Sequence, residues 1–167
     1  MLYLFNIGDK IFYPSQGVGV VDVIEEKEFR GEMQKYYNIH LLNNSLKLML
    51  PSSRLAISNI RLISDPTTLD HVLNNVNDYA TKEDELNSSN CKERMLTNTT
   101  KIKSGTLEDY IGVITDLTHI KMNHTLNTSE NQMLNSTRKI IIEEISLIKD
   151  ISNNEASDLL DTSLSIV

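Results

Sequence analysis

The chain has 167 residues, of which 40% are hydrophobic and 23% are charged, and its formal net charge is −7. This size suits one or two small domains, and the composition is typical of a folded protein rather than a disordered one. The acidic balance excludes a general nucleic-acid-binding coat, which needs a basic surface. No stretch approaches the ~18 apolar residues of a membrane span. The first residues lack the basic segment of a secretion signal, so we expect a cytoplasmic protein with no membrane partner.

The negative charge is concentrated in the second part of the chain. Residues 1–62 carry 7 Lys/Arg and 6 Asp/Glu, which leaves 9 and 17 for residues 63–167. Any DNA contact must therefore come from a small local patch, or be helped by a partner that is already on the DNA. Cys91 is the single cysteine, and the four histidines lack metal-ligand spacing. We therefore expect no disulfide, metal site, cofactor, catalytic centre or small-molecule substrate.

Residues 10–63 follow the rules for β-strands. Short apolar runs predict strands over residues 10–13, 17–24, 35–42, 46–50 and 59–63. Pro14 and Gly17 bound the first turn, residues 25–31 read as a charged hairpin tip, and Pro51 ends the fourth strand. Five short antiparallel strands in so short a stretch predict a small, bent barrel of the SH3 or Tudor type.

From Thr67 the hydrophobic period changes from about 2 to about 3.6 residues. We therefore expect a first domain over residues 1–65 and a helical domain over residues 66–167. Helices are predicted from Thr67, from Cys91, and after cap-like residues Thr106, Ser129 and Ser152. Residues 80–90 read as a solvated loop. The predicted fold class is α+β with two domains, the second an all-α bundle of about five helices.

Two groups of side chains are candidate binding sites. Lys27 and Phe29 lie on the predicted hairpin tip, where an aromatic ring beside basic residues is a common anchor design. The alternative is an ordinary solvated tip. The second group gives the only local basic density of the helical part, and spacings of about three and seven place several members on one helical face. Its members are Lys92, Arg94, Lys101 and Lys103. The alternative is a solubilising face.

The sequence resembles a known family over most of its length. Residues 5–21 (FNIGDKIFYPSQGVGVV), 46–51 (LKLMLP) and 60–62 (IRL) resemble the RNA-polymerase-interaction domain of CarD/CdnL bacterial transcription regulators. This domain also occurs in the transcription-repair coupling factor. Residues 101–105 (KIKSG), 126–134 and 140–144 are similar to the family's helical domain. The resemblance implies a Tudor-like domain that pairs with the polymerase β-subunit lobe. It also implies a helical domain that contacts promoter DNA at the upstream edge of the transcription bubble.

Individual positions follow from the resemblance. It implies that Lys27, Phe29 and Met49 face the polymerase. The family's minor-groove tryptophan falls on Cys91, and the family's DNA-contacting pattern also fits two nearby residues. With the basic side chains, the candidate DNA-binding residues are Cys91, Lys92, Arg94, Asn98 and Lys101.

Two questions stay open at the sequence level. Cys91 has no aromatic ring, and the alternative is that it packs inside the bundle as a small hydrophobe. The implied function is non-enzymatic modulation of the open promoter complex by bridging polymerase and upstream DNA. The alternative is a polymerase-tethered adaptor whose acidic helical domain binds a protein rather than DNA.

Overall fold

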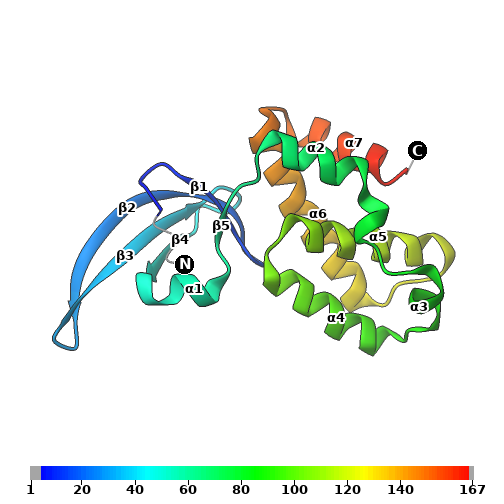
Figure 1. Cartoon of the computed structure of the whole chain (residues 1–167), viewed down its shortest axis with the longest axis horizontal. Helices are drawn as coiled ribbons and strands as arrows, with labels where there is room; N and C mark the ends of the chain where they lie inside the picture. The colour runs from blue at the N-terminus through cyan, green and yellow to red at the C-terminus, as the bar shows by residue number, and fades with distance from the viewer. Residues whose placement is uncertain (1–4, 166–167) are drawn as a thin grey trace. The chain divides into compact units, whose positions relative to one another are not determined.

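The computed structural model describes residues 5–165. The chain divides into two compact units, of which the first is Met1–Ile63 and the second is Ser64–Val167. The first unit is built on a β-sheet and the second on helices, which confirms the predicted α+β class (Figure 1). Among the described residues, no helix is long and apolar enough to cross a membrane.

The first unit is a five-stranded antiparallel sheet. The strands are β1 (Lys10–Tyr13), β2 (Gly17–Phe29), β3 (Glu32–Leu41), β4 (Lys47–Pro51) and β5 (Arg61–Leu62). Their order across the sheet is β4-β3-β2-β1-β5. All five predicted strands are present and form the expected Tudor-like fold. The 3-10 helix η1 (Ser52–Arg54) and the short helix α1 (Leu55–Ser58) follow β4, and the sequence analysis did not predict them.

The hairpin between β2 and β3 differs from the prediction. Residues 25–29 continue strand β2, and the turn is confined to Arg30 and Gly31, with φ of 53° and 82°. Two consecutive positive φ values are the signature of the type I′ turn, whose twist matches that of the flanking strands. Residues 26–29 are exposed, so the charged run lacks the alternation of a half-buried strand. The strand signal is therefore missing from the sequence there.

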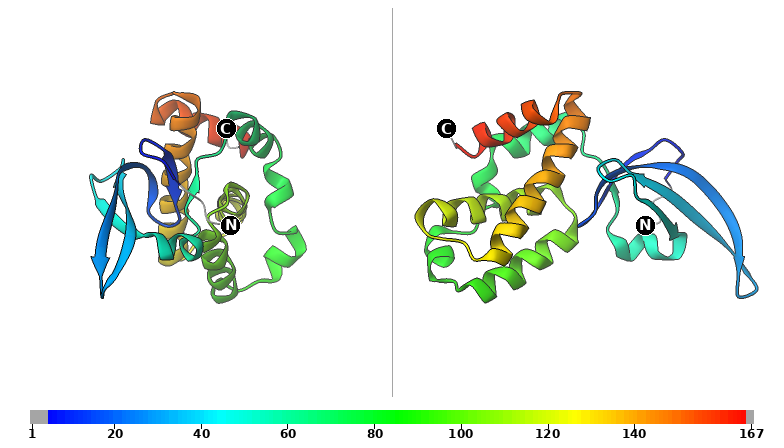
Figure 2. Two further views of the ribbon diagram at one scale, coloured as in Figure 1. Left: turned by 60° about the vertical axis from the view of Figure 1, so that its left-hand side comes forward. Right: turned by 180° about the vertical axis from the view of Figure 1, so that it is seen from behind.

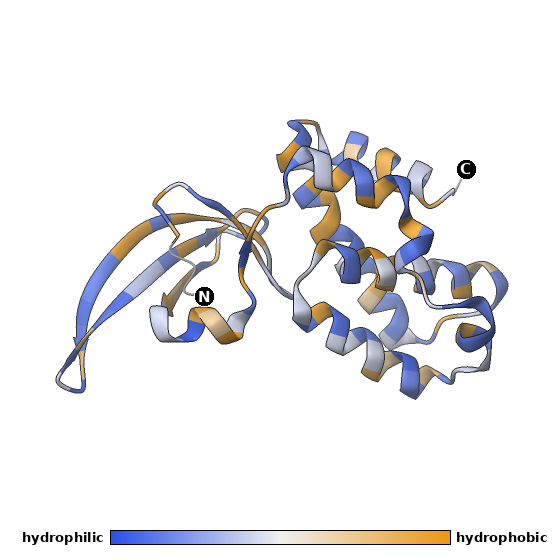
Figure 3. Ribbon diagram, in the orientation of Figure 1, coloured by the Kyte–Doolittle hydropathy of each residue, from blue (hydrophilic) through white to orange (hydrophobic). Residues whose placement is uncertain are grey.

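Up to residue 165, where the described chain ends, the second unit contains six α-helices. They are α2 (Pro66–Asn74), α3 (Glu83–Ser88), α4 (Cys91–Ser104), α5 (Leu107–Asn123), α6 (Thr128–Lys149) and α7 (Asn153–Ser163), with a 3-10 helix η2 (Val76–Tyr79) after α2. Helix α5 contacts α2, η2, α4 and α6, and most of its side chains are buried (Figure 2). Helix α2 carries both hydrophobic and hydrophilic residues, and Leu69, Val72 and Leu73 form its buried face (Figure 3).

Two local predictions about the helices are wrong. Residues 83–88 form α3 instead of a loop; the three acidic residues of its first turn favour a helix N-terminus, and Leu86 is buried. Helix α6 begins at Thr128, because Asn127 and not Ser129 is its N-cap and accepts a hydrogen bond from the Glu130 backbone N–H. Asn is as good an N-cap as Ser. The caps predicted at Thr106 and Ser152 are confirmed.

Candidate functional site

A β-bulge in β2 decides which side chains point away from the core of the first unit. Val21 is buried and pairs with Ile39, but the register shifts between Val21 and Val23. Beyond the shift, Ile24 pairs with the buried Tyr37 and faces the core. Side chains alternate along a strand, so the extra residue sends the odd-numbered positions that follow it to the opposite face.

That opposite face carries the residues expected to meet the polymerase. Val23, Lys27 and Phe29 lie on it from β2, and Met49 joins them from β4, because Val23 and Met49 both pair with Asn38 of β3. We call Val23, Lys27, Phe29 and Met49 the outer sheet face. Phe29 is 53% exposed and Met49 51% exposed. The Lys27 Nζ lies 3.9 Å from the Met49 Sδ and 3.2 Å from a Glu25 carboxylate oxygen. The structure therefore brings Lys27 and Met49 together, with Phe29 two residues further along the same face.

The hairpin that carries Phe29 extends beyond the other strands of the sheet (Figures 1 and 2). Strand β1 pairs with β2 only over Gly17–Val20, and β4 pairs with β3 only over Tyr36–His40. Among the described residues, positions 26–29 and 32–35 pair only with each other. A lone two-stranded ribbon is of marginal stability in water. An exposed aromatic ring on such a ribbon is suited to contact a partner.

The candidate DNA-binding residues divide into two sets on α4. Arg94, Asn98 and Lys101 are spaced by four and three residues and share one face of the helix. We call these three the inward stripe, because each is at least partly buried and two of them contact other helices of the unit. Cys91 and Lys92, in the first turn of α4, are exposed. The alternative that Cys91 packs inside the bundle is therefore wrong.

Arg94 forms a buried ion pair with Glu130. Its Nε and one terminal nitrogen donate to the two carboxylate oxygens of Glu130 at 2.8 and 3.3 Å. Its other terminal nitrogen donates to the Ser89 backbone carbonyl at 2.8 Å. The Glu130 side chain is only 1% exposed. This geometry links the segment before α4 to the start of α6, and a DNA contact by Arg94 stays a prediction.

The other two members of the inward stripe also point into the unit. Asn98 is 3% exposed, so a direct DNA contact would require its side chain to leave the interior. The Lys101 Nζ lies 3.9 Å from the buried carboxylate of Asp116 on α5. Asp116 in turn accepts hydrogen bonds from the backbone N–H and the hydroxyl of Thr81, at 2.8 and 2.6 Å.

The acidic partners of the inward stripe were missed at the sequence level. Asp116 could have been found, because it is the one charged residue between Tyr110 and Leu117, a run that is apolar apart from Thr115. A charged residue in such a run requires a partner. Glu130 gave no comparable signal, since it is surrounded by polar residues. Among the described residues, no group of three or more His, Cys, Asp or Glu side chains could hold a metal ion.

Comparisons with known proteins cover both units. Residues 5–64 match the family described as "CarD-like/TRCF RID domain", and residues 75–161 match "CarD, C-terminal domain". The "Putative transcription factor YdeB" of Bacillus subtilis (strain 168) is 36% identical over 152 residues, which is 91% of this chain and 97% of that protein. The solved structure "CdnLNt from Myxoccoccus xanthus" is 39% identical, covers 34% of this chain and 79% of that chain, and has a TM-score of 0.30. The chain therefore belongs to the CarD/CdnL family of transcription regulators that interact with RNA polymerase.

Proposed function

We propose that this protein binds the β subunit of RNA polymerase through its outer sheet face. We further propose that it modulates the open promoter complex by contacting DNA at the upstream edge of the bubble through α4. The observation that carries the proposal is the grouping of Lys27, Phe29 and Met49 on one exposed face of the sheet. This face combines an aromatic ring, a thioether and an ammonium group, and such mixed anchors are typical of binding hot spots.

The polymerase half is tested by comparing two variants of the full-length protein. Phe29→Ala should weaken capture of a β-lobe fragment by ~1–3 kcal/mol, the usual cost of losing an interface anchor. Met33→Ala is the matched control, because Met33 is 64% exposed on the same hairpin but pairs with Glu28 and so lies on the opposite face. Equal capture by the two variants would remove Phe29 from the binding site.

The DNA half rests on the exposed start of α4. The candidate DNA-binding residues are Cys91, Lys92, Arg94, Asn98 and Lys101, of which Cys91 and Lys92 are exposed. Because residues 63–167 carry 9 basic against 17 acidic side chains, we expect only weak binding to free duplex. The electrostatic repulsion acts over roughly a Debye length of ~8 Å at physiological salt. Polymerase that is already on the promoter would supply the affinity that the free protein lacks.

A gain-of-function variant tests this contact directly. A cysteine has no π-face, whereas stacking of an aromatic ring on a base is worth ~1–3 kcal/mol in single-strand binders. Cys91→Trp should therefore lengthen the lifetime of the open complex, and because Cys91 is exposed it should leave the melting temperature unchanged. An unchanged lifetime with a normally folded variant would argue that α4 does not meet the DNA.

A second candidate function is a polymerase-tethered adaptor whose acidic helical unit binds a protein. The engagement of Arg94 and Lys101 with Glu130 and Asp116 favours it, because fewer cations are left to contact phosphate. Salt dependence separates the two functions. For DNA binding through phosphates, the logarithm of the binding constant falls linearly with the logarithm of the salt concentration, and few phosphate contacts give a shallow slope. An adaptor would show no salt-dependent DNA binding at all.

A further inference from the structure

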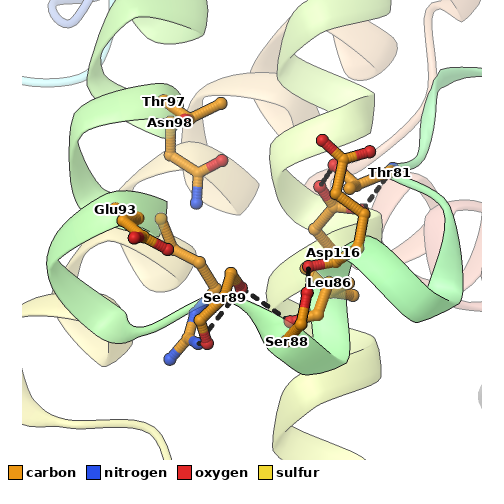
Figure 4. Close-up of a pocket in the computed structure, with 10 residues that line it drawn as sticks. Thr81, Leu86, Ser88, Ser89, Glu93, Thr97, Asn98 and Asp116 are labelled. Atoms are coloured by element: carbon orange, nitrogen blue, oxygen red, sulfur yellow. Dashed lines mark hydrogen bonds between the residues drawn. The ribbon is translucent and has the colours of Figure 1, made fainter.

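The second unit contains a polar pocket of about 280 Å³ between α3, α4 and α5. Asn98 and Thr97 line it from α4, and Asp116 lines it from α5 (Figure 4). Ser88 lines it from the end of α3, and Ser89 from the segment that joins α3 to α4. Small-molecule sites usually measure ~300–1,000 Å³. A pocket just below this range suits a ligand of only a few heavy atoms.

The amide of Asn98 is the first observation that points to a ligand. Its side chain is 97% buried, since only 3% is exposed, and it points from α4 into the pocket (Figure 4). Within residues 5–165, no side chain or backbone group forms a hydrogen bond with its carboxamide. The amide therefore faces the open space of the pocket, where water or a ligand takes the place of the protein partner that such deeply buried side chains usually have.

The charge of the lining is the second observation. Three carboxylates border the pocket, those of Glu85, Glu93 and Asp116, against the single guanidinium of Arg94. That guanidinium is already bound to the Glu130 carboxylate. Asp116 is itself only 3% exposed. Asp116 accepts two hydrogen bonds from Thr81 and lies 3.9 Å from the Lys101 Nζ. Because each carboxylate oxygen can accept more than one hydrogen bond, Asp116 has capacity for a further donor.

We propose that this pocket binds a small organic cation whose ammonium or guanidinium N–H groups donate to the Asn98 carbonyl oxygen and the Asp116 carboxylate. An anion is disfavoured because the three lining carboxylates outnumber the two nearby cations, and of these Arg94 is already paired with Glu130 and Lys101 lies beside Asp116. The inference is independent of polymerase and DNA binding, because it rests only on the interior of the second unit. A bound cation would join α4 and α5 across the pocket and offset part of the negative charge beside α4.

The test is a titration of the full-length protein with 1,4-diaminobutane, and in parallel with 1-amino-4-guanidinobutane. In the unaltered protein the reporter is the side-chain amide signal of Asn98 in ¹⁵N-resolved NMR spectra, assigned by its loss in Asn98→Ala. The affinities of all variants are compared by isothermal titration calorimetry, which does not depend on that signal. We expect that signal to shift in a saturable manner with at least one of the two probes. We also expect Asn98→Ala to weaken binding about tenfold or more, the loss typical of one hydrogen bond to a charged group.

Matched variants separate the pocket from general attraction to an acidic protein. Asn87→Ala removes an exposed asparagine of α3 that does not line the pocket and keeps the net charge the same; its binding should equal that of the unaltered protein. Equal binding by Asn98→Ala and Asn87→Ala would show surface attraction only and would overturn the proposal. So would the absence of saturable shifts with both probes.

A second substitution guards against loss of folding. Asn98→Leu should keep or raise the melting temperature, because it removes a buried amide that has no protein partner, and it should abolish binding of both probes. A melting temperature clearly below that of the unaltered protein would mean that Asn98 has a structural role in the unit. That result would remove the first observation on which the proposal stands.

Discussion

The ion pair between Arg94 and Glu130 should be essential for the stability of the second unit. Replacing Arg94 by Met keeps an unbranched apolar side chain as far as the position of the arginine Nε and removes the guanidinium. The Glu130 carboxylate, 1% exposed, would then be buried without its bidentate partner, and the Ser89 carbonyl would lose its donor. Removing one partner of a buried ion pair costs ~3–5 kcal/mol, because the remaining charge is uncompensated.

That cost is large for a unit of about 100 residues. In domains of this size, 1 kcal/mol corresponds to roughly 4–8 °C in melting temperature, so a loss of 3 kcal/mol would lower the midpoint by roughly 12–24 °C. Total folding free energies are only ~5–15 kcal/mol. The helical circular-dichroism signal, followed during urea denaturation, reports on this unit because nearly all of the helix lies within it.

The chain offers a matched control for this measurement. Arg138 lies 2.8 Å from Asp161, the same distance as the Arg94 Nε lies from Glu130, but the Asp161 side chain is 34% exposed. Arg138→Met should therefore cost ~1 kcal/mol or less, as partly exposed pairs do. Equal losses for Arg94→Met and Arg138→Met would refute the argument that burial of Glu130 sets the cost.

The double variant Arg94→Met, Glu130→Met connects stability to function. Replacing both partners of a buried pair by apolar side chains is often neutral or stabilising, so the double variant should recover most of the lost stability. It also has no guanidinium to offer to DNA. If its open-complex lifetime equals that of the unaltered protein, Arg94 acts through folding. If the lifetime falls while stability is restored, Arg94 contacts DNA.

Two further outcomes follow from single side chains. The Tyr37 hydroxyl is buried in the core of the first unit and has no hydrogen-bond partner among the described residues, so Tyr37→Phe should leave the free energy of unfolding unchanged or raise it by ~1 kcal/mol. A clear loss in urea denaturation would contradict this. The pKa of Asp65 is lowered because its carboxylate accepts hydrogen bonds from the backbone and hydroxyl of Thr68; its stabilisation is present above the ordinary carboxyl pKa and lost as pH falls through the lower folded value. Asp65→Asn keeps the cap of α2 and should show a smaller fall in melting temperature in that acidic range, whereas an identical pH profile would contradict the assignment.

The elements that sequence reasoning predicts well are those fixed by local chemistry. β1 occupies the predicted residues, and α5 and α7 begin after the predicted caps at Thr106 and Ser152, because turn and cap preferences act within three or four residues. The strand conformation of residues 25–29 is not predicted in this way, because a ribbon that is exposed on both faces needs no alternation of hydrophobic and polar residues.

The inward stripe of α4 shows a different limit. Helical periodicity correctly groups Arg94 with Lys101 on one face, but it does not say whether that face meets solvent or protein. Their partners, Glu130 and Asp116, come from other helices at sequence separations of 36 and 15 residues. The orientation of α4 is therefore a property of the packed unit, which the local sequence does not contain.

The bulge at Asp22 determines which side chains of β2 lie on the outer sheet face beyond it. With one residue fewer, the side of β2 that shows Lys27 and Phe29 would instead show Glu26 and Glu28, so an ammonium group and an aromatic ring would be replaced by two carboxylates. Asp22 thus controls which side chains are available to a binding partner without having to contact that partner itself. When the sequences of relatives are aligned, the residues of this strand should be matched by their distance from the bulge and not from the start of the chain. A gap of one position at the bulge would pair residues of one sheet face with residues of the other.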